Sequence, residues 1–135
     1  MAALANVRDT VQYSNQTAPS LFIYTVKSAT TIYQGSLVIL TSGIAEPGKT
    51  ASSGIVAVGR AEETVVNPSG GTLTVRVRQG CFKWGNDSSI SATNIGTSCY
   101  IVDDQTVAAT AGGTRSVAGT VCQVDSDGVW VSTKF

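Results

Sequence analysis

The chain has 135 residues, which is enough for one domain with a hydrophobic core and too few for two. Nine basic residues balance nine acidic ones, and only 13% of residues are charged, so no long-range electric field draws the chain to nucleic acid or to an anionic membrane. Fourteen glycines accompany many aliphatic residues and threonines, a composition typical of turn-rich, all-β proteins.

Residues 1–20 differ from the rest of the chain. They lack the basic start and apolar run of a secretion signal, and no stretch of the chain approaches the roughly 20 apolar residues of a membrane span. We therefore expect a soluble protein. The apolar residues Leu4, Val7, Val11 and Tyr13 follow no sustained period, which predicts either an extended arm that orders against a partner or a frayed terminus with no role.

Strand signals begin at residue 21. LFIYTV (21–26) and TIYQGSLVIL (31–40) are rich in branched and aromatic residues, and the glycine in the second string marks a bulge or bend. Residues 41–54 form a loop. VAVGRAEETVV (56–66) then leads through the turn at 67–71 into TLTVRVRQG (72–80), where strict alternation predicts a strand with one buried and one solvated face.

Phe82 and Trp84 have the same parity as Arg76 and Arg78. An unbroken strand would place both aromatic side chains on the solvated face. A bulge at Gly80 would turn them inward, because one inserted residue reverses the facing of every later one. We favour the buried arrangement, since exposing large aromatic side chains is costly; the alternative is a contact patch of aromatic residues and arginines.

The second half of the chain also reads as short strands joined by turns and loops. Residues 85–96 predict a loop with one helical turn. Strands are then predicted at CYIV (99–102), TVAAT (106–110), VAGTVCQV (117–124) and VWVSTKF (129–135). The last two strands are joined by a tight hairpin on Asp127-Gly128, since an Asp-Gly pair between strand residues is a strong hairpin signal.

Two parts of the chain repeat one pattern. GSLVILTSGIA (35–45) and GTSCYIVDDQTVA (96–108) each start with glycine, and a second glycine follows 24 positions after Gly35 and 23 positions after Gly96. A repeat of this kind predicts an all-β fold, a small single-domain β-barrel or β-sandwich built from two similar halves. The halves lie at about 35–80 and 96–133, within a domain of residues 21–135 that follows an N-terminal arm, 1–20.

No residues predict catalysis, a cofactor or a metal site. The chain has no histidine, the usual general base. The Asp103-Asp104 and Asp125–Asp127 strings fit turns, and cross-strand ion pairs with Arg76 and Arg78 account for Glu62. Three cysteines without C-x-x-C spacing fit buried free thiols. We therefore expect neither an enzyme nor a nucleic-acid-binding protein.

Particular strings resemble a known family. VGRAEETV, TVRVRQGCFKW, CYIVDDQTVAAT, GTRSVAGTV and VDSDGVWV resemble small proteins encoded beside the major capsid protein of tailed bacteriophages, the capsid decoration or cement proteins. The resemblance covers residues 21–133, and its most specific strings are VDDQTVA (102–108) and AGTVCQVDSDGVWV (118–131). It implies a compact β-barrel-like trimer on the outer face of an expanded icosahedral shell.

The resemblance implies a virion structural protein, made in the cytoplasm of the bacterial host, that binds the major capsid protein and itself and stabilises the head against internal DNA pressure. The alternatives are a tail or baseplate subunit, a glycan-binding adhesin module with Trp84 or Trp130 as an aromatic platform, and an enzyme. The residues expected to contact the capsid or another partner are Leu4, Val7, Arg8, Val11, Tyr13, Arg76, Arg78, Phe82 and Trp84.

Overall fold

The computed structural model describes residues 21–133. Within them, one short 3₁₀-helix accompanies twelve β-strands. The elements are β1 (Leu21–Thr25), β2 (Thr30–Ile32), β3 (Leu37–Thr41), β4 (Ile44–Pro47), β5 (Ile55–Ala61), β6 (Val65–Asn67), β7 (Thr74–Arg78), β8 (Gly80–Asn86), η1 (Ala92–Asn94), β9 (Ser98–Ile101), β10 (Thr106–Ala108), β11 (Val117–Asp125) and β12 (Gly128–Thr133).

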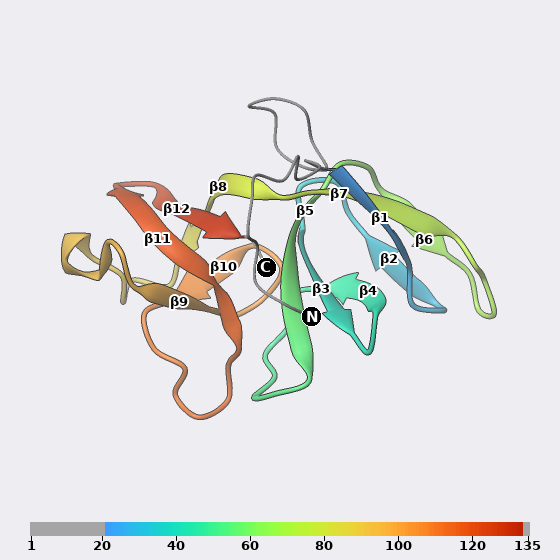
Figure 1. Cartoon of the computed structure of the whole chain (residues 1–135), viewed down its shortest axis with the longest axis horizontal. Helices are drawn as coiled ribbons and strands as arrows, with labels where there is room; N and C mark the ends of the chain where they lie inside the picture. The colour runs from blue at the N-terminus through green and yellow to red at the C-terminus, as the bar shows by residue number, and fades with distance from the viewer. Residues whose placement is uncertain (1–20, 134–135) are drawn as a thin grey trace, which may run out of the picture.

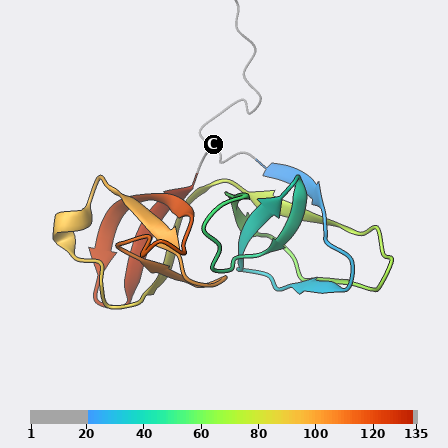
Figure 2. The same ribbon diagram turned by 90° about the horizontal axis from the view of Figure 1, so that it is seen from below.

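The strands form two lobes side by side along the long axis (Figures 1 and 2). One lobe contains a sheet in the order β1-β7-β5-β3-β4, whose ends are joined by a parallel bridge between Val26 and Ala45. We call these five strands the first ring. The other lobe is a closed barrel in the order β10-β8-β12-β11-β9, which we call the second ring. The predicted all-β domain of two similar halves is confirmed.

The two rings share one connectivity. In chain order, β1, β3, β4, β5 and β7 correspond to β8, β9, β10, β11 and β12, and every neighbouring pair of one ring has its counterpart in the other. The closing pair is parallel in both rings, and the remaining pairs are antiparallel. Even single hydrogen bonds recur: the Gly35 amide donates to the Ala61 carbonyl at 2.9 Å, and the Gly96 amide donates to the Val121 carbonyl at 2.8 Å.

The second repeated glycine has a steric role in each ring. Gly59 of β5 lies at a register shift in the pairing of β5 with β3, and Gly119 of β11 lies at one in the pairing of β11 with β9. A Cβ atom on Gly59 would collide with the Arg78 carbonyl oxygen, and one on Gly119 would collide with the Ser132 carbonyl oxygen. Glycine therefore permits the same close approach of two backbones in both halves.

The strands β3 and β5 join the rings into one domain. Leu37, Ile39 and Ala57 pack into the hydrophobic core of the second ring, whereas Val38 and Val58, the alternate residues, pack into that of the first ring. Burial on both faces explains why residues 37–40 read as an unbroken apolar run. Removing the second ring would therefore expose one face of both strands.

Phe82 and Trp84 become buried where β7 leads into β8, and the alternation of side chains continues unbroken across this connection. β7 pairs within the first ring and β8 within the second, with Gln79 between them. The side of the strand that carries Arg76 and Arg78 in the first ring therefore becomes the inner side in the second. Trp84 is 5% exposed, and the half-buried Phe82 packs against the same core. The preferred burial is found, but it follows from the change of ring and needs no bulge at residue 80.

Three local expectations are corrected. Residues 41–54 are not all loop, because β4 (Ile44–Pro47) lies within them. The β11–β12 hairpin turns at residues 126–127, since Asp125 pairs with Gly128; Gly128 instead makes room for Lys83, whose Cγ would lie 2.7 Å from an added Cβ. Of the three cysteines only Cys99 is buried.

Candidate interaction surfaces

A cluster of charged side chains marks the junction of the rings. Arg60 of β5 lies opposite Arg78 of β7, and Glu62 accepts hydrogen bonds from both guanidinium groups, at 2.9 Å from Arg60 Nη2. The Arg60 guanidinium also lies over the Phe82 ring, 4.2 Å from its centroid. Burial opposes ionisation of Glu62, but the hydrogen bonds and charges of the two arginines outweigh it, so the pKa of Glu62 is lowered.

Arg76 forms a second pair on the same sheet. Its guanidinium lies 3.0 Å from Glu63, which also accepts the Arg76 backbone amide. Hydrogen bonds from Arg76 therefore lower the pKa of Glu63. Arg76 is exposed and Arg78 is half-buried. Both predicted contact arginines thus have carboxylate partners within the chain, Glu63 for Arg76 and Glu62 for Arg78, and contact with a capsid stays a prediction.

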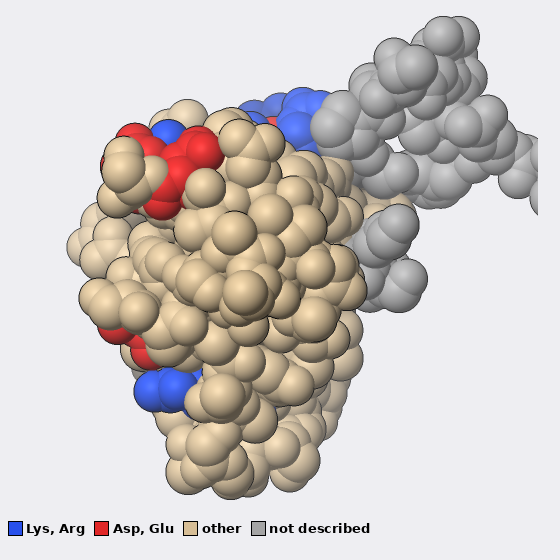
Figure 3. Space-filling model, turned by 90° about the vertical axis from the view of Figure 1, so that its left-hand side faces the viewer, with Lys and Arg blue, Asp and Glu red and all other residues tan. Residues whose placement is uncertain are grey.

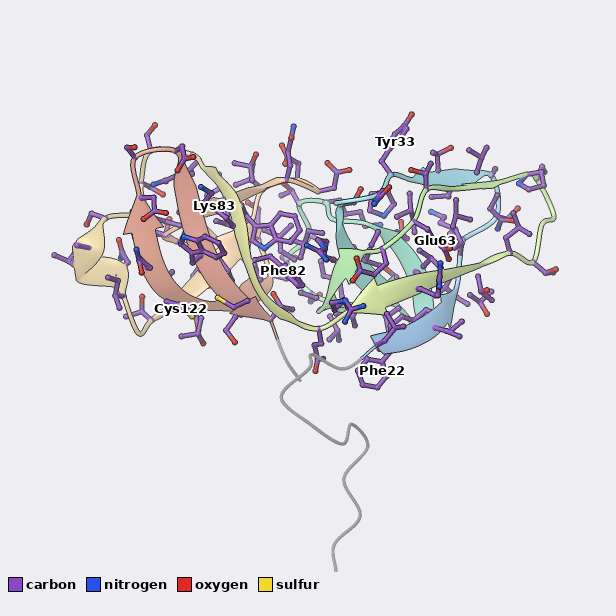
Figure 4. All side chains as sticks on the ribbon, turned by 90° about the horizontal axis from the view of Figure 1, so that it is seen from above. Phe22, Tyr33, Glu63, Phe82, Lys83 and Cys122 are labelled. Atoms are coloured by element: carbon purple, nitrogen blue, oxygen red, sulfur yellow. The ribbon has the colours of Figure 1, made fainter. Side chains whose placement is uncertain are left out.

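The other predicted contact residues have different positions. Trp84 belongs to the core, so it is neither a contact residue nor the aromatic platform of an adhesin. Phe82 lies at the junction between the two lobes (Figure 4). Trp130 is half-buried, its indole nitrogen donates to Asp125 at 2.8 Å, and Lys83 lies over its ring. Five predicted residues lie outside the described part of the chain: Leu4, Val7, Arg8, Val11 and Tyr13.

The first ring carries an element that the described second ring lacks. The strands β2 and β6 pair as a separate two-stranded ribbon, which we call the β2–β6 ribbon. β2 belongs to the connection between β1 and β3, and β6 to the twelve residues, 62–73, between β5 and β7. The corresponding connections of the second ring contain η1 and the two-residue turn of the β11–β12 hairpin. The ribbon is thus an addition to the shared ring.

The ribbon has one buried and one exposed face. Ile32 and Val65, a cross-strand pair, belong to the core of the first ring. Because side chains alternate along a strand, Val66 and Tyr33 belong to the opposite face, where they are 66% and 64% exposed. Tyr33 points away from the body of the molecule in Figure 4. Residues 28–45 and 64–75 contain no charged residue, so this exposed face is apolar and neutral.

Asn67 fixes the loop at the end of the ribbon. Its side chain is almost fully buried and its amide nitrogen donates to the carbonyl oxygens of Val26, Lys27 and Gly71 at 3.0, 3.1 and 3.3 Å. Its amide oxygen accepts from the Leu73 backbone. A buried, satisfied polar network of this kind holds a loop in one conformation. The ribbon therefore presents its exposed side chains on a rigid support.

The remaining surface offers little chemistry. Among residues 21–133, no group of three or more histidine, cysteine or carboxylate side chains is arranged to hold a metal ion, and no helix there is long and apolar enough to cross a membrane. Figure 3 shows the end of the second ring, where charged side chains are few and acidic ones gather at one edge. Burial raises the pKa of the Cys99 thiol to about 12, which keeps it protonated at neutral pH.

Sequence reasoning missed the ribbon, although a signal for it was present. The repeat placed Gly59 and Gly119 in equivalent strands, so the lengths of the connections that follow could have been compared. Twelve residues separate β5 from β7, and two separate β11 from β12. An insertion in one copy of a repeat often lies on a functional face.

Comparisons of the chain with models of protein families, with curated proteins and with solved structures find no match.

Proposed function

We propose that this chain is a capsid decoration protein of a tailed bacteriophage, which binds the outer surface of the assembled head as a homotrimer and stabilises it against internal DNA pressure. The proposal combines the resemblance of residues 21–133 to that family with a surface suited to protein contact. It names the major capsid protein as partner, and the virion, after synthesis in the bacterial cytoplasm, as location.

The observation that carries the proposal is the β2–β6 ribbon. The shared ring accounts for the repeated glycines and the two cores, whereas the ribbon exposes Val66 and Tyr33 that neither core requires. Leu73, 47% exposed, follows on the loop that Asn67 fixes. Rigid apolar side chains on a neutral surface favour contact with another protein, because little side-chain entropy is lost when they are covered.

A decoration protein needs no reaction centre. Any molecule that binds the assembled shell but not its separated subunits stabilises the shell by mass action. Many copies on one particle multiply a modest free energy of binding per copy. Because the ribbon is uncharged, we expect its contact with the shell to depend on packing and to change little with ionic strength.

The test is co-sedimentation of purified protein with expanded, undecorated capsids. We expect stoichiometric binding by the wild type, and a loss of about tenfold or more in affinity for Val66→Asp, because a charge would be buried without a partner. The matched control is Ile95→Asp, which places the same carboxylate at an apolar residue, 48% exposed, in the second lobe. Control binding should equal that of the wild type.

Three outcomes would count against the proposal. If the wild type fails to bind shells, decoration is rejected. If Val66→Asp binds as the wild type does while its thermal midpoint is unchanged, the ribbon is not the contact surface. If purified protein instead forms stacked rings or tubes, the tail or baseplate alternative gains the advantage.

A further inference from the structure

A groove separates β5 of the first ring from β11 of the second. It encloses about 510 Å³ and is lined by residues 55–57 of β5, residues 115–119 around the start of β11, and Ser52. Val56 and Val117, on opposite sides, are 52% and 48% exposed. The groove is thus a mainly apolar depression at the junction of the two rings.

One side of the groove is an open strand edge. β5 pairs with β3 from residue 55 to residue 60, but with β7 only at Arg60 and Ala61. Backbone amide and carbonyl groups of a strand point alternately to its two sides. Along residues 55–57, the groups that point away from β3 have no strand beside them in the described part of the chain. The equivalent groups of β11 are partly covered, since Thr133 donates to the Ala118 carbonyl at 3.0 Å.

A cation that has no carboxylate partner among residues 21–133 lies at the same groove. Six of the seven lysines and arginines in residues 21–133 form ion pairs, and Arg115 is the exception. Its guanidinium donates only to the Thr110 carbonyl, at 3.2 Å, among the described residues. None of the described residues that line the groove is acidic. A planar guanidinium beside an apolar surface is suited to pair with a carboxylate.

We propose that this groove binds an extended segment of a partner polypeptide, which adds to the open edge of β5 and sets a carboxylate against Arg115. Strand addition supplies backbone hydrogen bonds, and pockets for alternate side chains supply specificity. The apolar lining selects apolar residues on either side of the carboxylate. The identity of the partner rests on the proposed function: it is an acidic segment of the shell protein. This segment is distinct from the part of the shell that the neutral ribbon contacts.

The first test uses the shell. Arg115→Gln should lower affinity for undecorated capsids about tenfold or more, because a charge-assisted hydrogen bond is lost, and should flatten the dependence of binding on salt. Arg115→Lys should restore part of the affinity, and Lys83→Gln, which alters a cation already paired with Asp127, should leave it unchanged. Wild-type binding with an equally tight Arg115→Gln variant would overturn the groove proposal and leave decoration intact.

The second test does not need the shell. A capped heptapeptide that alternates valine and threonine around a central aspartate, and its asparagine counterpart, are titrated into isotope-labelled protein. We expect amide shifts at residues 55–57 with the aspartate peptide, weaker shifts with the asparagine peptide, and weaker shifts in Val56→Asp. No shift at β5 with either peptide would overturn the proposal. So would amide protection of residues 55–57 in the free protein that disappears when residues 1–20 are deleted, because the chain would then cover its own edge.

Discussion

The two rings have the same strand plan but differ in what they add to it. The first ring adds the β2–β6 ribbon, while the second ring closes fully and joins its equivalent strands by a two-residue turn. Seven of the nine large apolar residues that are exposed in the described chain precede residue 80. What the rings share is required for folding, so the surface that one ring alone possesses is the better candidate for function.

Charge separates the rings as well. Residues 21–79 contain five basic and three acidic residues, whereas residues 80–133 contain two basic and five acidic ones. The acids of the first ring are glutamates that each pair with at least one cation. Those of the second ring are aspartates, of which only Asp127 forms an ion pair with another described residue. The acidic residues therefore form ion pairs in the first ring and lie mostly in turns in the second.

The largest predicted effect tests what the rings share. Gly59→Ala and Gly119→Ala should each lower the free energy of unfolding by about 3 kcal/mol, since each new Cβ collides with a backbone carbonyl that cannot move alone. Gly35→Ala and Gly96→Ala are the controls: both have positive φ and open space around the Cβ position, so about 1 kcal/mol is expected. Denaturant unfolding measures all four.

Equal losses at the two collision sites would establish that the rings are energetically equivalent there. A loss at Gly59→Ala no larger than that of its control would mean that β5 and β7 can separate at little cost. The duplicated close approach would then be a feature of the sequence without a role in stability.

A second prediction tests whether the rings unfold together. Val75 is fully buried in the core of the first ring, so Val75→Ala should cost about 2 kcal/mol. Both tryptophans, Trp84 and Trp130, belong to the second ring. Because β3 and β5 contribute to both cores, we expect tryptophan fluorescence to report the same loss as far-UV circular dichroism. An unchanged fluorescence transition would show that the second ring unfolds independently.

The repeat could be predicted because its glycines and apolar strings recur in order along the chain. The ribbon was missed, because β2 and β6 continue the apolar character of their neighbours within the strings 31–40 and 56–66, and only the unequal lengths of the connections indicated it. The alternation of side chains correctly showed that Phe82 and Trp84 share the parity of Arg76 and Arg78. How the two aromatic side chains become buried could not be predicted, because β7 and β8 belong to different rings and this is set by contacts between strands far apart in sequence. The pairing of Glu62 with Arg78 was predicted, while that with Arg60 was not.

A third prediction concerns acid. Burial opposes ionisation of Glu62 and Glu46, but other contacts outweigh it and lower both pKa values. At Glu62 these are the hydrogen bonds and charges of Arg78 and Arg60, and at Glu46 they are the hydrogen bond of Thr41 and the hydrogen bond and charges of Lys49 and Lys27. A lowered pKa gives stability that is present above the unfolded value and is lost as pH falls through the folded value. The thermal midpoint should therefore drop below about pH 4.5. The double variant Glu46→Gln, Glu62→Gln should start lower at pH 7 and drop less.

The smallest predicted effect belongs to the second ring. Asp127 lies 2.9 Å from Lys83, and hydrogen bonding lowers the pKa of the carboxyl and raises that of the amine. Both groups are solvated, so water and salt screen the pair, and Asp127→Asn should leave the thermal midpoint unchanged within error at pH 7. The half-buried Glu62 has two arginine partners, so Glu62→Gln should lower the midpoint measurably. If Asp127→Asn lowered the thermal midpoint as much as Glu62→Gln does, burial would not decide which ion pairs stabilise this fold. Ion pairs would then stabilise both rings equally.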